Sequence, residues 1–86
     1  MMNAGIAEMM RVTVADAECL LNGRVCESVA NALGTQPIHI QSYIDTGSAA
    51  PVFADRLGMD TAAAEDMGNR LGRKGRIGLI VGMLLD

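Results

Sequence analysis

Turn residues divide this 86-residue chain into short segments, and this division limits what it can fold into. The stretches Asn22-Gly23 and Asp45-Thr46-Gly47-Ser48 are typical of turns and loops. Gly34 and Gly58 each follow a leucine, where a glycine ends a helix because it adopts the left-handed conformation at no steric cost. The elements between these points are short, so the sequence predicts one small domain over residues 1–86.

The first third of the chain is predicted to be helical. Apolar residues recur at helical spacing between Val14 and Leu33, and Thr13 with Asp16 resembles a capping box. We expect one kinked helix or two short helices here, with a break at Asn22-Gly23. Residues 1–12 carry only a weak pattern and are expected to fray.

The segment from Gln36 to Tyr43 changes character. Ile38 and Ile40 alternate with polar neighbours, which favours a short strand. The alternative is a short helix with Pro37 in its first turn, where proline is tolerated.

Two further helices are predicted in the second half. The first starts near Ala49, accepts Pro51 in its first turn and ends at Gly58. The second covers residues 61–73, with the Asp60 carboxylate accepting the free amides of its first turn. Its inner face is predicted to carry Ala64, Met67 and Leu71.

Two glycines and an aliphatic C-terminal segment add three further expectations. Gly68 lies inside the second helix at a cost of about 1 kcal/mol relative to alanine, which indicates close packing there. Gly75 is expected to end the helix. Residues 76–85 are mostly aliphatic and are predicted to form a strand or a tail that contacts a partner.

Composition adds two constraints. Half of the residues are apolar, yet Tyr43 and Phe53 are the only aromatic ones, so the core must be mainly aliphatic with help from seven methionines. So short a chain cannot bury all of this apolar surface, and we expect a second copy to cover part of it in a homodimer.

The cysteines and the hydropathy pattern suggest where the chain works. Cys19 and Cys26 are seven residues apart, which is not a zinc-site spacing, and no second cysteine pair follows. His39 is the only histidine of the chain, so we expect free thiols and no metal site. Neither a secretory leader nor an apolar run long enough for a membrane span is evident, which favours a cytoplasmic protein without membrane contact.

Residues 53–61 carry the features of a helix-turn-helix. Ala54 is small where two helices would cross, Leu57 would fill the angle between them, and Gly58 would end the first helix. Asp60 would then cap the second. A similar apolar-Ala-x-x-Leu-Gly stretch, Val29 to Gly34, is a weaker indication of another such unit.

From Leu57 to Ile77 the sequence resembles winged-helix regulators of the MarR kind, in which a helix ending in Leu-Gly precedes a capped recognition helix and a basic segment. The resemblance implies a mainly α fold with minor β structure: a winged-helix-like helix-turn-helix domain with residues 49–77 as its core. It also implies DNA-facing positions at Thr61, Ala62, Ala63, Asp66 and Arg70, of which only Arg70 could make a bidentate contact to guanine. The acidic pair Glu65 and Asp66, the short wing and the missing dimerisation helix depart from that pattern.

Charge leaves two kinds of partner open. Net charge is −3, yet Arg70, Arg73, Lys74 and Arg76 form a basic cluster suited to phosphate contact. We therefore expect a non-catalytic regulatory protein, first a DNA-binding transcriptional regulator, with an acidic protein-interaction module (an anti-activator, antitoxin or phage-encoded inhibitor) as the alternative. In that alternative the methionine-rich and C-terminal aliphatic surfaces make the contact.

No catalytic arrangement is recognisable. His39 has no cysteine, serine or acid at catalytic spacing, and the adjacent Glu65 and Asp66 point in different directions along a helix. The glycines fit no phosphate-binding loop. We expect neither enzymatic activity nor a cofactor.

Overall fold

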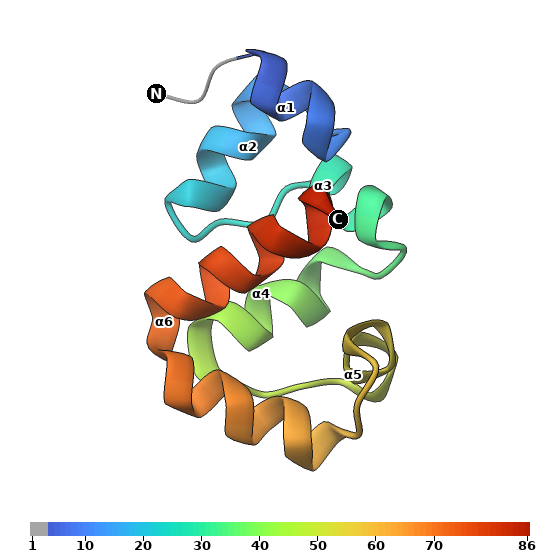
Figure 1. Cartoon of the computed structure of the whole chain (residues 1–86), viewed down its shortest axis with the longest axis vertical. Helices are drawn as coiled ribbons and strands as arrows, with labels where there is room; N and C mark the ends of the chain where they lie inside the picture. Colours follow the sequence, from blue (N-terminus) through green and yellow to red (C-terminus); the bar gives the residue numbers. More distant parts are fainter. Residues whose placement is uncertain (1–3) are drawn as a thin grey trace.

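Six helices follow one another in the computed structural model, which describes residues 4–86 (Figure 1). They are α1 (Ala4–Met10), α2 (Val14–Leu21), α3 (Glu27–Leu33), α4 (Pro37–Thr46), α5 (Pro51–Leu57) and α6 (Thr61–Leu85). Within the described range there is no strand. The mainly helical prediction is confirmed, whereas the minor β structure and the wing are not.

Helix α6 is bent into two halves at Gly72. This residue has φ 72° and ψ 177°, a left-handed φ that favours glycine and interrupts the helix. The first half lies near α5, and the second half passes α4 and reaches the end of the molecule formed by α1 and α2 (Figure 1). A single helix thereby contacts each of the other five.

The core is centred on the two aromatic rings. Tyr43 and Phe53 are fully buried, with ring centroids 4.8 Å apart and planes tilted by 49°. The Tyr43 hydroxyl donates to the Ala64 carbonyl at 2.8 Å, so its polar end is satisfied inside the core. Burial raises the pKa of Tyr43, and the nearby Arg76 partly opposes this. Aliphatic residues and one methionine fill the space around the rings: Met10, Leu20, Val29, Leu33, Ile40, Ile44 and Ile80.

Two strand predictions were wrong. In α4, Ile40, Tyr43 and Ile44 are buried at helical spacing while Ile38 is 68% exposed, so the alternation that suggested a strand was not a burial pattern. The helical alternative, with Pro37 in the first turn, is confirmed. Residues 76–85 likewise continue α6, since the three aliphatic residues buried there are spaced for a helix: Ile77, Ile80 and Leu84.

The other predicted helix boundaries were partly right and partly wrong. Residues 14–33 form two helices with Gly23 (φ 84°) between them, which confirms the second of the two predicted alternatives. The break expected at Gly75 lies at Gly72 instead, and Leu71, expected inside, is exposed. Fraying was predicted for residues 1–12, but α1 buries Ala7 and Met10; residues 1–3 lie outside the described part.

Predicted helix starts are well explained by their side chains. Thr13 accepts the Asp16 amide at 3.0 Å, and Asp60 accepts the Ala63 amide at 2.7 Å. Asp16 does not complete a capping box; its carboxylate accepts the Ser28 hydroxyl at 2.6 Å, which lowers the pKa of Asp16 and joins α2 to α3.

Candidate functional site

The predicted helix-turn-helix is formed by α5, Gly58 and the first half of α6. Gly58 has φ 76° and ψ 28°, and the Met59 amide donates back to the Ala54 carbonyl at 3.1 Å. This is the hydrogen-bonding pattern of a helix that ends on a left-handed glycine. Ala54 is buried and Leu57 is half-buried, in agreement with the packing roles proposed for them.

A second unit with the same turn lies upstream. Gly34, with φ 70° and ψ 29°, ends α3, and the Thr35 amide donates to the Ala30 carbonyl at 3.2 Å. Val29 and Ala30 are buried, as Phe53 and Ala54 are. The repeated apolar-Ala-x-x-Leu-Gly pattern therefore corresponds to a repeated helix–turn–helix geometry, with α4 as the second helix of the upstream unit.

The face of α6 predicted to meet DNA is accessible but electrically neutral. Ala62 and Ala63 are exposed, Thr61 is half-buried, and Asp66 binds Arg70 through atoms 2.9 Å apart. These two charged side chains are 63% and 78% exposed, so the pair contributes only about 0.3–0.5 kcal/mol to stability. The pair nevertheless places a carboxylate directly beside the only arginine of this face.

The basic cluster does not form one surface. The Arg73 guanidinium donates to the Asp45 carboxylate at 3.1 Å and to the Gly23 carbonyl at 3.3 Å, linking α6 to α4 and to the α2–α3 turn. Arg76 is buried, with 8% of its surface exposed. Among the four cations, only the exposed Lys74 has no hydrogen-bond or ion-pair partner within residues 4–86.

Arg76 acts on two helix ends at once. Its Nε donates to the Ile44 carbonyl in the last turn of α4 at 3.0 Å, and its Nη1 donates to the Gly68 carbonyl at 2.8 Å. The guanidinium thereby gives the Gly68 carbonyl, one turn before the bend at Gly72, a donor from the second half of α6. A cation is also favoured at the negative end of a helix. The sequence suggested a phosphate contact for this residue, while its contacts are structural.

Three other features of the described residues bear on function: metal-binding side chains, the two thiols and helix hydropathy. No group of three or more histidine, cysteine, aspartate or glutamate side chains in residues 4–86 is placed to hold a metal ion. Cys19 and Cys26 are free and half-buried, and a hydrogen bond with the Cys19 thiol raises the pKa of Cys26. No helix in the same range has the length and apolar character needed to cross a membrane.

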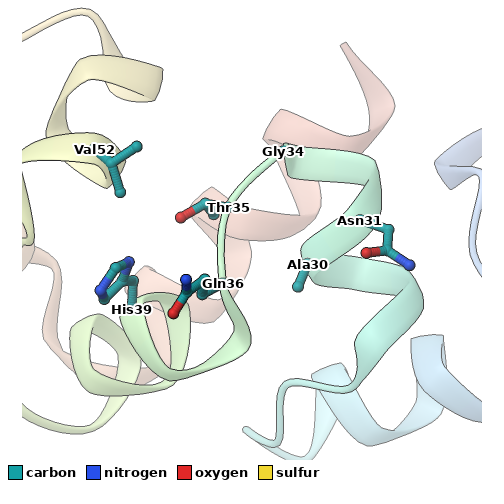
Figure 2. A pocket seen from close by; sticks show the side chains of 7 residues that line it. All are labelled: Ala30, Asn31, Gly34, Thr35, Gln36, His39 and Val52. Carbon is teal, nitrogen blue, oxygen red and sulfur yellow. The ribbon is translucent and has the colours of Figure 1, made fainter.

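One pocket was not anticipated from the sequence. It has a volume of about 390 Å³ and lies between the α3–α4 turn and the start of α5 (Figure 2). Seven residues line it: Ala30, Asn31, Gly34, Thr35, Gln36, His39 and Val52. The sequence shows His39 only as an isolated histidine, because the tertiary fold is what places it in the same pocket as Val52.

Comparison with known proteins gives no relative. No family model, curated protein or solved structure matches this chain.

Proposed function

We propose that this chain is a non-catalytic regulatory domain that acts by binding protein, and that a second copy of the chain is its first partner. The observation that carries this choice is that most cations of the basic cluster are bound within the chain itself. Arg70 and Arg73 form ion pairs with carboxylates, and Arg76 is buried. Affinity for nucleic acid comes largely from cations that replace the counterions of phosphates. A chain of net charge −3 with one unengaged cation in that cluster is poorly equipped for this role.

The proposed contact surface is the hollow between the end of α1 and the end of α6. It has a volume of about 290 Å³ and a mainly polar open surface; Met9, Met83 and Leu85 line part of it, with Arg11, Arg56 and Asp86 beside them. Met9 and Leu85 are among the exposed large apolar residues, and methionine adapts well to a partner surface. Because its two arginines outnumber its one aspartate, a complementary partner combines aliphatic and acidic side chains.

Helix α2 of a second copy has this character. Val14, Glu18 and Leu21 follow one another at helical spacing, and both aliphatic residues are exposed. Seating α2 of each copy against the hollow of the other would bury aliphatic surface and bring Glu18 near Arg11. Such a reciprocal contact is the arrangement expected of a two-fold dimer.

A charge exchange tests this dimer. Arg11→Glu is expected to weaken dimerisation at least tenfold by placing like charges together, and Glu18→Arg in the same chain is expected to restore it. Sedimentation equilibrium of the three proteins over a concentration series gives the dissociation constants. Leu71→Glu, an exposed aliphatic position outside the hollow, is the control and should leave association unchanged. A wild-type chain that stays monomeric would contradict the proposal, as would a double variant in which dimerisation is not restored.

Removing residues 80–85 would be a poor test of association. Ile80 is fully buried and Leu84 is nearly so, so the deletion would remove part of the core. Point changes at Arg11 and Glu18 avoid this problem.

DNA binding is the second candidate, favoured by the accessible face of α6 that carries Ala62, Ala63, Asp66 and Arg70. Fluorescence anisotropy of a labelled random duplex, at low and near-physiological salt, separates the two functions. For a protein-binding domain we expect no salt-sensitive binding at micromolar protein. Salt-sensitive binding that Arg70→Ala and Lys74→Ala each weaken would make DNA the partner instead.

A further inference from the structure

Cys19 and Cys26 lie on either side of the α2–α3 turn. Cys19 belongs to the last turn of α2, and Cys26 is the N-cap of α3. In one continuous helix, residues seven apart would be about 10 Å apart along the axis, whereas the Cα atoms of a disulfide lie within about 7 Å. Here α2 ends at Leu21 and Gly23, with φ 84°, turns the chain, which removes that obstacle.

Hydrogen bonds on both sides of Cys26 hold it against α2. Before it, the Arg24 amide donates to the Cys19 carbonyl at 2.9 Å. After it, the Ser28 hydroxyl and amide donate to the Asp16 carboxylate at 2.6 and 3.2 Å. Asp16 and Cys19 are three residues apart and therefore share a face of α2. Cys26, between these two attachments, lies over that face, and the two thiols are hydrogen-bonded to each other.

The turn between the cysteines is held on its other side by α4 and α6. The Gln41 side chain accepts from the Val25 amide and donates to the Gly23 carbonyl, both at 2.8 Å. The Arg73 guanidinium donates to the same carbonyl at 3.3 Å. None of these contacts involves a thiol. The fold therefore keeps the two cysteines close before any bond joins them, which is a form of preorganisation.

The thiols have the properties of a pair that reacts slowly. Neither cysteine is closed off from solvent, since both are half-buried. The hydrogen bond with Cys19 and burial raise the pKa of Cys26, so its thiol is almost entirely protonated at neutral pH. A thiol of high pKa is seldom ionised for attack and is also a poor leaving group from a disulfide. A disulfide between these two residues would form slowly and, once formed, would resist reduction.

We propose that Cys19 and Cys26 are a redox site, which a small-molecule disulfide such as glutathione disulfide converts from two thiols to one intramolecular disulfide. One cysteine thiolate attacks a sulfur of the oxidant, forms a mixed disulfide and releases one glutathione. The other cysteine thiolate attacks the protein sulfur of that mixed disulfide, and the second glutathione leaves. Two electrons and two protons pass in total from the two cysteines to the two glutathiones. This site is independent of the dimer proposed above.

Equilibration of the folded wild-type chain with mixtures of reduced and oxidised glutathione, followed by acid quenching and intact mass measurement, tests the site. The expected product has lost two hydrogen atoms and carries no glutathione. Its equilibrium constant is expected to be at least tenfold larger for the folded chain than for the chain unfolded in urea, because only the fold holds the thiols together.

The same comparison predicts a change in stability. A tenfold ratio between folded and unfolded chains means that the disulfide stabilises the fold by about 1.4 kcal/mol. The melting temperature of the oxidised chain is therefore expected to rise by at least about 5 °C. Dithiothreitol should return both the mass and the melting temperature to those of the reduced chain.

Two variants connect the result to the geometry of the turn. Cys26→Ser is expected to gain one glutathione and to form no internal disulfide. Cys19→Ser combined with Leu21→Cys keeps two thiols but moves the first by about 200° around α2, to an exposed position. In the folded state its internal disulfide is expected to be at least tenfold less favourable than that of wild type, with little difference between the two chains in urea.

Three outcomes would overturn the proposal. The first is that mixed disulfides with glutathione are the only products of the folded wild-type chain. The second is an equal equilibrium constant in the folded and unfolded wild-type chain. The third is an internal disulfide that forms as readily in the folded double variant as in wild type.

Discussion

Replacing Arg76 by methionine is expected to destabilise the folded chain by about 3 kcal/mol, the sum of two lost hydrogen bonds to a charged donor at roughly 1.5 kcal/mol each. Methionine keeps much of the side-chain volume, so the loss reports on the Ile44 and Gly68 carbonyls, which are left without this donor. For a domain of this size the melting temperature should fall by about 12–24 °C. Thermal unfolding followed by circular dichroism measures the change.

Lys74→Met is the matched control, because Lys74 belongs to the same basic cluster but is exposed. Its effect should stay within about 0.5 kcal/mol of zero. Arg76→Lys should lie between, since an ammonium cannot reach both carbonyls with the geometry of a guanidinium. Equal stability of Arg76→Met and wild type would show that Arg76 does not hold the bend of α6.

Gly68→Ala is expected to destabilise the protein by about 2 kcal/mol, even though alanine gains up to about 1 kcal/mol of helix propensity. The added Cβ would lie 2.7 Å from Tyr43 Oη and 2.8 Å from Cζ. The ring has little freedom to retreat, because Phe53 packs against it and its hydroxyl is bound to Ala64. Chemical denaturation at equilibrium gives the free energy of unfolding.

Gly78→Ala is the control on the same helix. A Cβ at Gly78 meets nothing within 4 Å, so this variant should be stabilised by up to about 1 kcal/mol. The two alanines therefore have opposite expected signs. If both variants were stabilised, the close contact between α6 and Tyr43 would be wrong.

Local signals in the sequence predicted local structure well. Thr13 and Asp60 were assigned as helix caps, and Gly34 and Gly58 as helix ends, because each acts within one turn of itself. Gly68 could also be assigned to a close contact, although its partner Tyr43 is 25 residues away and could not be named.

The errors arose where tertiary contacts decide. The alternation around Ile38 and Ile40 satisfies a strand pattern as well as a helical one, and only the burial of Ile40 with Tyr43 and Ile44 separates them. The break lies at Gly72, just before Arg76 reaches the end of α4, and the sequence alone gives no sign that Gly72 rather than Gly75 takes the left-handed conformation. The winged-helix resemblance also predicted a β wing after the recognition helix, where the chain continues as α6.

The candidate site shows the same limit. Four nearby cations in the sequence suggested one phosphate-binding surface, but a helix turns its side chains to different sides. Arg73 meets Asp45, Arg76 enters the core, and Lys74 faces outward. The pocket beside His39 brings together residues of three consecutive helices, and the spacing of these residues in the sequence does not say how the helices face one another.

The bend at Gly72 also affects how the native state opens. It interrupts the hydrogen-bond ladder of α6, so fraying that starts at Thr61 meets a boundary instead of travelling to Leu85. Phe53 and Ala64 hold the segment before this boundary in the core, while Ile77 and Ile80 anchor the second half. Local opening near Thr61 is therefore expected to stop at Gly72 and not to spread along the whole helix. In hydrogen-exchange terms the long helix would behave as two cooperative units joined by one glycine.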